Sequence, residues 1–132
     1  MVSSQVQPFL MFEGNAEEAM NLYVSLFADG EVLAIERYGP GEASVDGSIK
    51  VARFRIGGQT VMCIDSPAKH DFSFTPAFSF FVEFESEDEQ SRIYGGLVPG
   101  GSVFMPMGNY GFSRSFAWIS DTFGVSWQLS VP

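Results

Sequence analysis

The sequence contains few residues of several chemically important kinds. Cys63 is its one cysteine and His70 its one histidine, which excludes an intrachain disulfide and a cysteine-based zinc site. Seven basic residues stand against sixteen acidic ones, for a net charge of −9, and no basic stripe is available to bind a nucleic-acid backbone. No apolar run approaches the roughly 20 residues of a membrane helix. We therefore expect neither nucleic acid nor membrane as a partner.

The start of the chain and its cysteine content both bear on location. Residues 1–5 lack the basic start and the apolar stretch of a signal peptide. A single free cysteine suits a reducing compartment. The sequence therefore predicts a cytoplasmic protein.

Apolar and aromatic residues are abundant. Of the 132 residues, 45% are hydrophobic, fourteen are phenylalanine and only 17% are charged, a composition that supports a packed core and excludes a disordered chain. The length fits one domain, which we expect to span residues 1–132.

One sequence pattern occurs twice. Near the start, an apolar run leads into Asn15-Ala16-Glu17-Glu18, which is typical of a helix that opens with a capping box, and Ser86-Glu87-Asp88-Glu89 repeats this. Each half then closes on a glycine followed by an alternating strand. A period of roughly 70 residues is too long for a solenoid and indicates a duplicated module.

Periodicity and turn residues predict the same order of elements in each half. In module one (6–65) we expect a strand at 7–12, a helix at 15–27 and strands at 31–38, 49–56 and 59–65. A linker covers 66–75. In module two (76–132) we expect a strand at 76–84, a helix at 87–97 and strands at 102–107, 113–120 and 125–131. The chain is thus predicted to be α+β, with two βαβββ modules.

Strand alternation assigns side chains to two faces. On the last strand, Trp127 and its apolar neighbours are expected under a helix, which leaves Ser126 and Gln128 toward a cavity. On strand 59–65, Met62 is expected to face the cavity, while Val61 and Cys63 face the helix. On the first strand, Pro8, Leu10 and Phe12 are expected on the cavity side. Both tryptophans, Trp118 and Trp127, are interpreted as core aromatics.

Four further residues have roles that the sequence leaves open. Cys63 is interpreted as an inert buried thiol, and His70 as a loop residue, although a Cys63–His70 pair is conceivable. Arg53 and Arg55 share one face of a strand, where they either pair with a carboxylate ligand or lie exposed.

Three stretches of the sequence match those of a known family: 8–19 (PFLMFEGNAEEA), 74–79 (FTPAFS) and 118–128 (WISDTFGVSWQ). With them the chain resembles the vicinal oxygen chelate superfamily of glyoxalase and bleomycin-resistance proteins. More closely it is similar to the PhnB-like branch, which bears the label 3-demethylubiquinone-9 3-methyltransferase. The resemblance implies a glyoxalase-like fold, in which mixed sheets of the two modules curl around a shared cavity with the helices outside.

The resemblance also indicates where metal-dependent relatives place their four ligands. Those positions correspond here to Pro8, Met62, Ser79 and Gln128. Proline has no side-chain donor, and the thioether of methionine is poorly matched to Mg²⁺, Mn²⁺ or Zn²⁺. We therefore expect no metal and no other cofactor, and a cavity lined by the ligand-binding candidates Pro8, Leu10, Met62, Ser79, Ser126 and Gln128.

Two kinds of function follow from these expectations. One is a module that binds a small apolar or aromatic molecule in a metal-free cavity. The alternative is a superfamily enzyme, an isomerase, lyase or dioxygenase, with a non-standard metal site or none. Methyl transfer in the literal sense is not expected, because no Gly-rich loop enters a helix of a βαβ unit. Modules of this family pair within or between chains, and we expect a homodimer.

Overall fold

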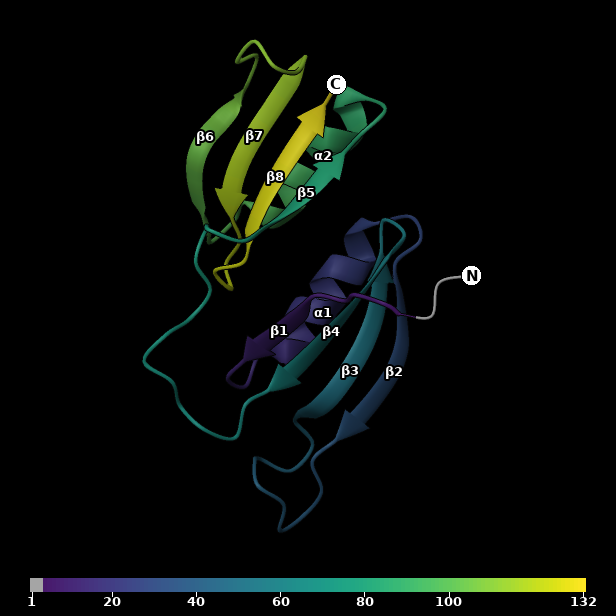
Figure 1. Cartoon of the computed structure of the whole chain (residues 1–132), viewed down its shortest axis with the longest axis vertical. Coiled ribbons are helices and arrows are strands. Elements are labelled where there is room, and N and C mark those ends of the chain that lie inside the picture. The colour runs from purple at the N-terminus through teal and green to yellow at the C-terminus, as the bar shows by residue number, and fades with distance from the viewer. Residues whose placement is uncertain (1–3) are drawn as a thin grey trace. The chain divides into compact units, whose positions relative to one another are not determined.

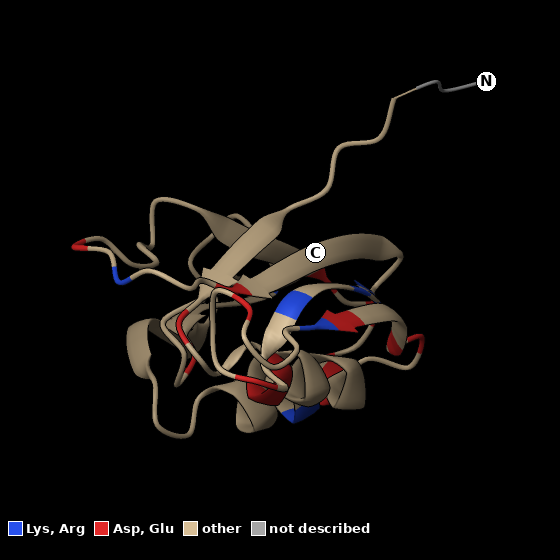
Figure 2. Cartoon of the chain, turned by 90° about the horizontal axis from the view of Figure 1, so that it is seen from below, with Lys and Arg blue, Asp and Glu red and all other residues tan. Residues whose placement is uncertain are grey.

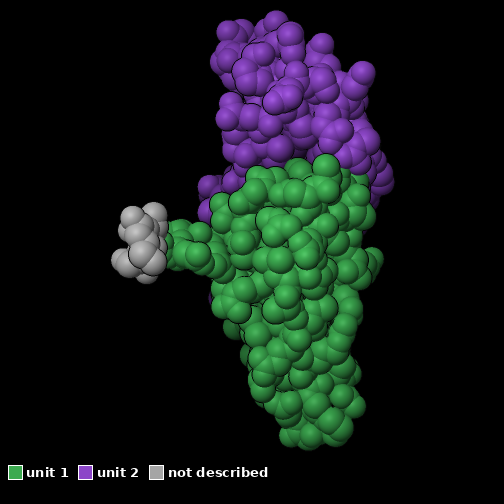
Figure 3. Space-filling view, turned by 90° about the vertical axis from the view of Figure 1, so that its right-hand side faces the viewer, with its two compact units in different colours: residues 1–70 green, residues 71–132 purple. Residues whose placement is uncertain are grey.

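The structure, a computed structural model, describes residues 4–132, which form two compact units (Figure 3). The first unit ends at His70 and the second runs from Asp71 to Pro132. Each contains one four-stranded sheet and one helix. The boundary falls inside the segment 66–75 that the sequence predicts as a linker. No helix among residues 4–132 is long and apolar enough to cross a bilayer.

The first unit has the element order βαβββ. Its elements are β1 (Phe9–Phe12), α1 (Ala16–Leu26), β2 (Glu31–Arg37), β3 (Ile49–Ile56) and β4 (Gln59–Asp65). The strand order across the sheet is β1-β4-β3-β2, with β1 parallel to β4 and the other neighbours antiparallel. The helix packs on one face of this mixed sheet (Figure 1). The opposite face is not covered by any helix of this unit.

The second unit repeats this arrangement. Its elements are β5 (Ser79–Glu83), α2 (Glu87–Leu97), β6 (Ser102–Gly108), β7 (Ser115–Ser120) and β8 (Ser126–Val131). The strand order is β5-β8-β7-β6, and β5 runs parallel to β8 (Figure 1). The α+β class and the duplicated βαβββ order predicted from the sequence are therefore confirmed.

Prolines account for the late start of the first strand of each unit. The first strand was expected from residue 7 and begins at Phe9, directly after Pro8. The strand expected from residue 76 begins at Ser79, because residues 75–78 form a turn in which the Phe78 N–H donates to the Thr75 carbonyl. A proline has no N–H for a strand ladder and suits the start of a strand or a turn.

The first helix is not capped as the sequence predicts. The side chain of Asn15 makes no capping hydrogen bond, so the expected role of this residue is wrong. Asp65, at the end of β4, replaces it: one carboxylate oxygen accepts from the backbone N–H groups of Gly14 and Ala16, both at 2.9 Å. The side chain of either Asn15 or Asp65 can accept a hydrogen bond from an unpaired N–H at a helix start. The carboxylate of Asp65 also carries a full negative charge, which interacts favourably with the positive end of the helix dipole.

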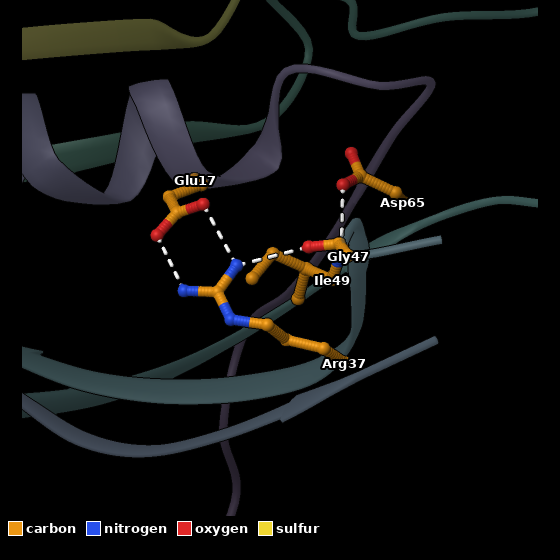
Figure 4. A network of polar contacts seen from close by, with 5 residues as sticks. All are labelled: Glu17, Arg37, Gly47, Ile49 and Asp65. Atoms are coloured by element: carbon orange, nitrogen blue, oxygen red, sulfur yellow. Dashed lines mark hydrogen bonds and ion pairs between the residues drawn. The ribbon is translucent and has the colours of Figure 1, made fainter. Parts of the chain in front are cut away.

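Asp65 also joins the helix start to the sheet. Its second oxygen accepts from the N–H of Ile49 at 2.9 Å, while its backbone carbonyl accepts from the hydroxyl of Tyr38. Nearby, Arg37 makes a two-pronged ion pair with Glu17 in the first turn of α1 and donates to the carbonyl of Gly47 (Figure 4). These contacts attach α1 to the ends of β2, β3 and β4.

The second helix begins as the sequence predicts. The hydroxyl of Ser86 accepts from the N–H of Glu89, which is the capping bond expected at this position. The inward residues are partly different, however. Ile93 and Leu97 are buried as expected, whereas Tyr94 is only half buried and Gln90 is fully buried. The amide nitrogen of Gln90 donates to the Leu129 carbonyl at 3.1 Å, which holds α2 against β8.

Candidate functional site

Each sheet has one face under its helix and a second, open face that carries most of the candidate site residues. In β8, Trp127, Leu129 and Val131 are fully buried on the helix side, whereas Gln128 is half buried. This is the alternation predicted for the last strand. In β4, Val61 and Cys63 are likewise fully buried, and Met62 is half buried, again as predicted.

Three expected site residues come together on the open face of the second sheet. The hydroxyls of Ser79 and Ser126 are 2.6 Å apart, and the amide nitrogen of Gln128 donates to Ser79 Oγ at 3.4 Å. The indole N–H of Trp118 donates to Ser126 Oγ at 2.9 Å. We call these four residues the Ser79 cluster. Among the described residues, no imidazole or carboxylate is hydrogen bonded to its hydroxyls.

Exposed aromatic side chains lie beside the Ser79 cluster. Phe81 is the register partner of Gln128, and its ring centroid lies 6.4 Å from that of Phe116 in β7. Phe112 packs edge-on against Phe116 at 4.8 Å. Phe81 is 57% exposed and Phe112 is 63% exposed, so their rings contribute apolar surface next to the cluster. An apolar surface with a few grouped polar atoms is typical of small-molecule sites.

The two tryptophans have different roles. Trp127 is a core residue, as predicted: it is fully buried, and its indole N–H donates to Asp121 at 2.9 Å. Trp118 is half buried on the open face, with its ring centroid 5.1 Å from that of Phe104, so the prediction that it is a core aromatic is wrong. Alternation within strand 115–120 could have predicted this placement, because it puts Trp118 on one face with Phe116 and Ser120 and puts Ile119 on the other.

In the first sheet, the register corrects one predicted site residue. Leu10 was expected on the cavity side together with Met62, but the β1–β4 ladder pairs Leu10 with Cys63 and Phe9 with Met62. Neighbours in a ladder share a face, so Leu10 lies under the helix, where it is buried. Phe12 is buried on that side as well. Phe9, which the sequence reasoning missed, lies on the open face instead.

Pro8 contacts β4 through its backbone. It precedes β1 and is half buried, and its carbonyl accepts from the N–H of Met62 at 2.9 Å, which extends the parallel ladder by one bond. Because Pro8 lies outside the strand, its expected cavity-facing placement stays a prediction.

The positions that hold a metal in the superfamily do not fit a divalent ion here. Pro8 and Met62 offer a ring and a thioether, while Ser79 and Gln128 offer only a neutral hydroxyl and a neutral amide, whose nitrogen donates to Ser79 Oγ. Divalent metals in proteins are held mainly by carboxylate, imidazole or thiolate groups, with neutral carbonyl oxygens as additional ligands of Ca²⁺. Among residues 4–132, no three or more His, Cys, Asp or Glu side chains are grouped in a way that could hold a metal ion.

Cys63 and His70 do not form the pair that the sequence left open. Cys63 is buried under the helix, and burial, followed by the charge of Asp65, raises the pKa of its thiol to about 12. This agrees with an inert thiol, because a nucleophilic cysteine needs a lowered pKa. His70 contacts Ser66 instead, with 3.0 Å between Nε2 and the serine Oγ.

A separate pocket lies among the loops of the first unit. It has a volume of about 310 Å³, and its walls come from three loops: Glu13 and Gly14; Ser44, Val45 and Ser48; and 66–69. The hydroxyl of Ser66 donates to the Ala68 carbonyl and accepts from the Ala68 N–H, an arrangement that holds a turn. None of the expected site residues lines this pocket.

Comparison with known families fits this geometry. Residues 4–130 match the family model described as 3-demethylubiquinone-9 3-methyltransferase. The chain belongs to this family. The match covers both sheets and both helices, so the family assignment applies to the whole duplicated arrangement and not to one half.

Solved structures support the same assignment. A putative 3-demethylubiquinone-9 3-methyltransferase, PhnB protein, from Bacillus cereus is 45% identical, with a TM-score of 0.95, over 98% of this chain and 100% of that one. Protein PA1353 from Pseudomonas aeruginosa is 31% identical, with a TM-score of 0.86, over 98% of both chains. The fosfomycin resistance protein FosX from Listeria monocytogenes, solved with Mn(II) and a dihydroxypropylphosphonic acid, shares only the fold: 13% identity, TM-score 0.63, 98% and 93% coverage.

Proposed function

We propose that this protein binds a small apolar or aromatic molecule on the open faces of its sheets, without a metal ion. The observation that carries the proposal is the second sheet, where exposed aromatic rings lie beside the Ser79 cluster. Burying the side chains of Phe81 and Phe112 against a ligand removes apolar surface from water, which supplies binding energy. The cluster supplies hydrogen bonds that select the orientation of the ligand.

The tryptophans make a direct test possible. Trp118 lies on the open face and Trp127 in the core, so a bound ligand is expected to quench only the fluorescence of Trp118. We propose titration with N-phenyl-1-naphthylamine, a neutral aromatic probe, whose emission rises when it leaves water. Saturable binding with loss of Trp118 emission supports the proposal, and Trp118→Phe should remove the quenching. Absence of saturable binding to the folded protein would refute it.

Metal analysis separates this proposal from the enzyme alternative. The purified protein is expected to contain less than about 0.1 equivalent of any divalent metal, because Ser79 and Gln128 are neutral and weak ligands. A stoichiometric metal that survives dialysis against a chelator contradicts the metal-free proposal. Such a result would favour the isomerase, lyase or dioxygenase alternative. The fosfomycin resistance protein FosX, solved with Mn(II), shows that this fold can hold a metal.

A homodimer is part of the proposal. In each unit the helix covers one face of the sheet only, and large apolar side chains are exposed, among them Phe9 and Phe81. Sheets with one uncovered apolar face generally pack against a second layer. We expect multi-angle light scattering to give about twice the 14.5 kDa chain mass at micromolar concentration. A mass of one chain under those conditions would contradict the dimer.

A further inference from the structure

A row of four side chains crosses the open face of the first sheet, and it contains one cation. Register pairs Phe9 with Met62 in β1 and β4, Met62 with Arg53 in β4 and β3, and Arg53 with Ala34 in β3 and β2. We call these four residues the Arg53 row. The side chain of Arg53 is exposed, and its neighbours along the row are apolar.

The guanidinium of Arg53 makes no ion pair or hydrogen bond to any side chain among residues 4–132. This is notable because sixteen acidic residues are present (Figure 2), and four of the seven cations are paired. Arg55, two positions along the same strand and on the same face, is held by Asp29 and Glu31. Lys69 and Arg114 also have no ion pair, but Lys69 is a loop residue and Arg114 precedes β7.

The second sheet has an aromatic ring at the position equivalent to Arg53. In the second sheet, Phe81 pairs with Gln128, and Gln128 pairs with Trp118. In the first sheet, Phe9 pairs with Met62, and Met62 pairs with Arg53. Each row therefore begins with an exposed phenylalanine. The third position is a cation in one sheet and an indole in the other.

We infer that Arg53 binds an anionic group of the ligand, and that the ligands of this protein are aromatic or apolar molecules with a carboxylate or a similar oxyanion. The inference rests on the proposed function and specifies its substrate class. A guanidinium presents a planar fork of donors that matches two oxygens of one anion. Its attraction to an anion strengthens when an apolar ligand excludes water from the row.

Two probes with the same aromatic skeleton test this inference. 8-Anilino-1-naphthalenesulfonate carries a sulfonate, whereas N-phenyl-1-naphthylamine is its neutral counterpart. We expect Arg53→Gln to weaken binding of the sulfonate about tenfold and to change binding of the neutral probe less than twofold. Arg53→Lys should give an intermediate, several-fold loss, because an ammonium is a point charge without the fork.

Two control variants isolate the effect. Lys69→Gln removes the same charge from the linker and should leave both affinities within about twofold, because Lys69 is a loop residue and does not belong to the Arg53 row. Phe9→Ala should weaken both probes equally, because it removes apolar contact and no charge. Circular dichroism and urea unfolding establish whether each variant is folded. If Arg53→Gln does not fold, Arg53→Lys replaces it in the comparison.

The outcomes distinguish this inference from the proposed function. If the wild-type protein binds neither probe, the proposed function fails and the inference fails with it. If it binds both, and Arg53→Gln and Arg53→Lys leave the sulfonate affinity unchanged, only the inference is overturned. An equal loss of sulfonate binding in Arg53→Gln and Lys69→Gln also overturns it, because the effect is then one of net charge.

Discussion

The carboxylate of Asp65 accepts a hydrogen bond from the N–H of Ala16, which lies 49 positions earlier in the chain. The same side chain accepts from Gly14 and from Ile49, and it is buried. One residue at the end of β4 thus fixes the start of α1 and the start of β3.

Replacement of Asp65 should therefore be severely destabilising. Asp65→Ala leaves three N–H groups without their acceptor, and each such group costs about 1–3 kcal/mol when it is buried. We expect a loss of at least about 3 kcal/mol in the free energy of unfolding, measured with urea. Asn15→Ala is the matched comparison at the same helix start, with an expected loss below about 0.5 kcal/mol. Similar losses for both variants would contradict the assigned role of Asp65.

Asp29 should contribute a pH-dependent part of the stability. Its carboxylate accepts from Gly58 at 2.8 Å and from Gly57 at 2.7 Å, and these bonds, with Arg55 nearby, lower its pKa in the folded state. A lowered folded pKa stabilises the fold above the unfolded pKa of about 3.9, and this stabilisation disappears as the pH falls through the folded pKa. Asp29→Asn should therefore be less stable than wild type at pH 7, but not at about pH 2.

The expected effect at Asp29 is small. The side chain is 39% exposed, so screening by solvent keeps the deficit at pH 7 below about 1 kcal/mol. Urea unfolding at a series of pH values measures it. Asp46→Asn removes a charge from the loop between β2 and β3 and serves as the control. A deficit for Asp29→Asn that persists unchanged in acid would show that the charge is not involved.

The thiol of Cys63 should be unreactive in the folded protein. Its pKa of about 12 leaves it protonated at pH 8, and the side chain is buried under α1. We expect labelling by 5,5′-dithiobis(2-nitrobenzoate) to be at least a hundredfold slower in buffer than in 6 M urea, because reaction requires the thiolate and access. Rapid labelling of the folded protein at pH 8 would mean that the β4 region opens readily.

Gly30 and Gly95 should respond to alanine in opposite ways. A Cβ at Gly30 would lie 1.9 Å from the carbonyl oxygen of Val24, so Gly30→Ala forces the backbone to move and should cost about 1–3 kcal/mol. Gly95 lies inside α2, where a Cβ meets no atom within 4 Å, and Gly95→Ala should stabilise by up to about 1 kcal/mol. Thermal unfolding of both variants measures the difference in sign.

The elements were predictable wherever local pattern determines them. Strands 49–56 and 59–65 and helix 87–97 were predicted with the bounds that the structure shows, because alternation, the Gly57-Gly58 turn and the Ser86 cap are all local. The cap of α1 was not predictable in this way. Its acceptor, Asp65, is distant in the sequence, and no local pattern distinguishes it from the suitable but unused Asn15.

The candidate site residues of the second unit were predictable from the sequence, and those of the first unit were less so. Ser79, Ser126 and Gln128 were expected on one face and do form one cluster. Leu10 was assigned to the wrong face, because β1 is only four residues long and apolar on both sides, so alternation cannot fix its pleat. Whether any of these residues binds a ligand stays a prediction for the experiments above.

The parallel pairs β1–β4 and β5–β8 join the first strand of each unit to its last. During synthesis on the ribosome, neither sheet can be completed until its final strand has left the exit tunnel. Contacts of such long sequence separation form late and slow folding. The first unit, however, holds all its strands once β4 has emerged, and it can fold while the second is still being translated. The order of the strands along the chain thus allows the first sheet to be completed before the second.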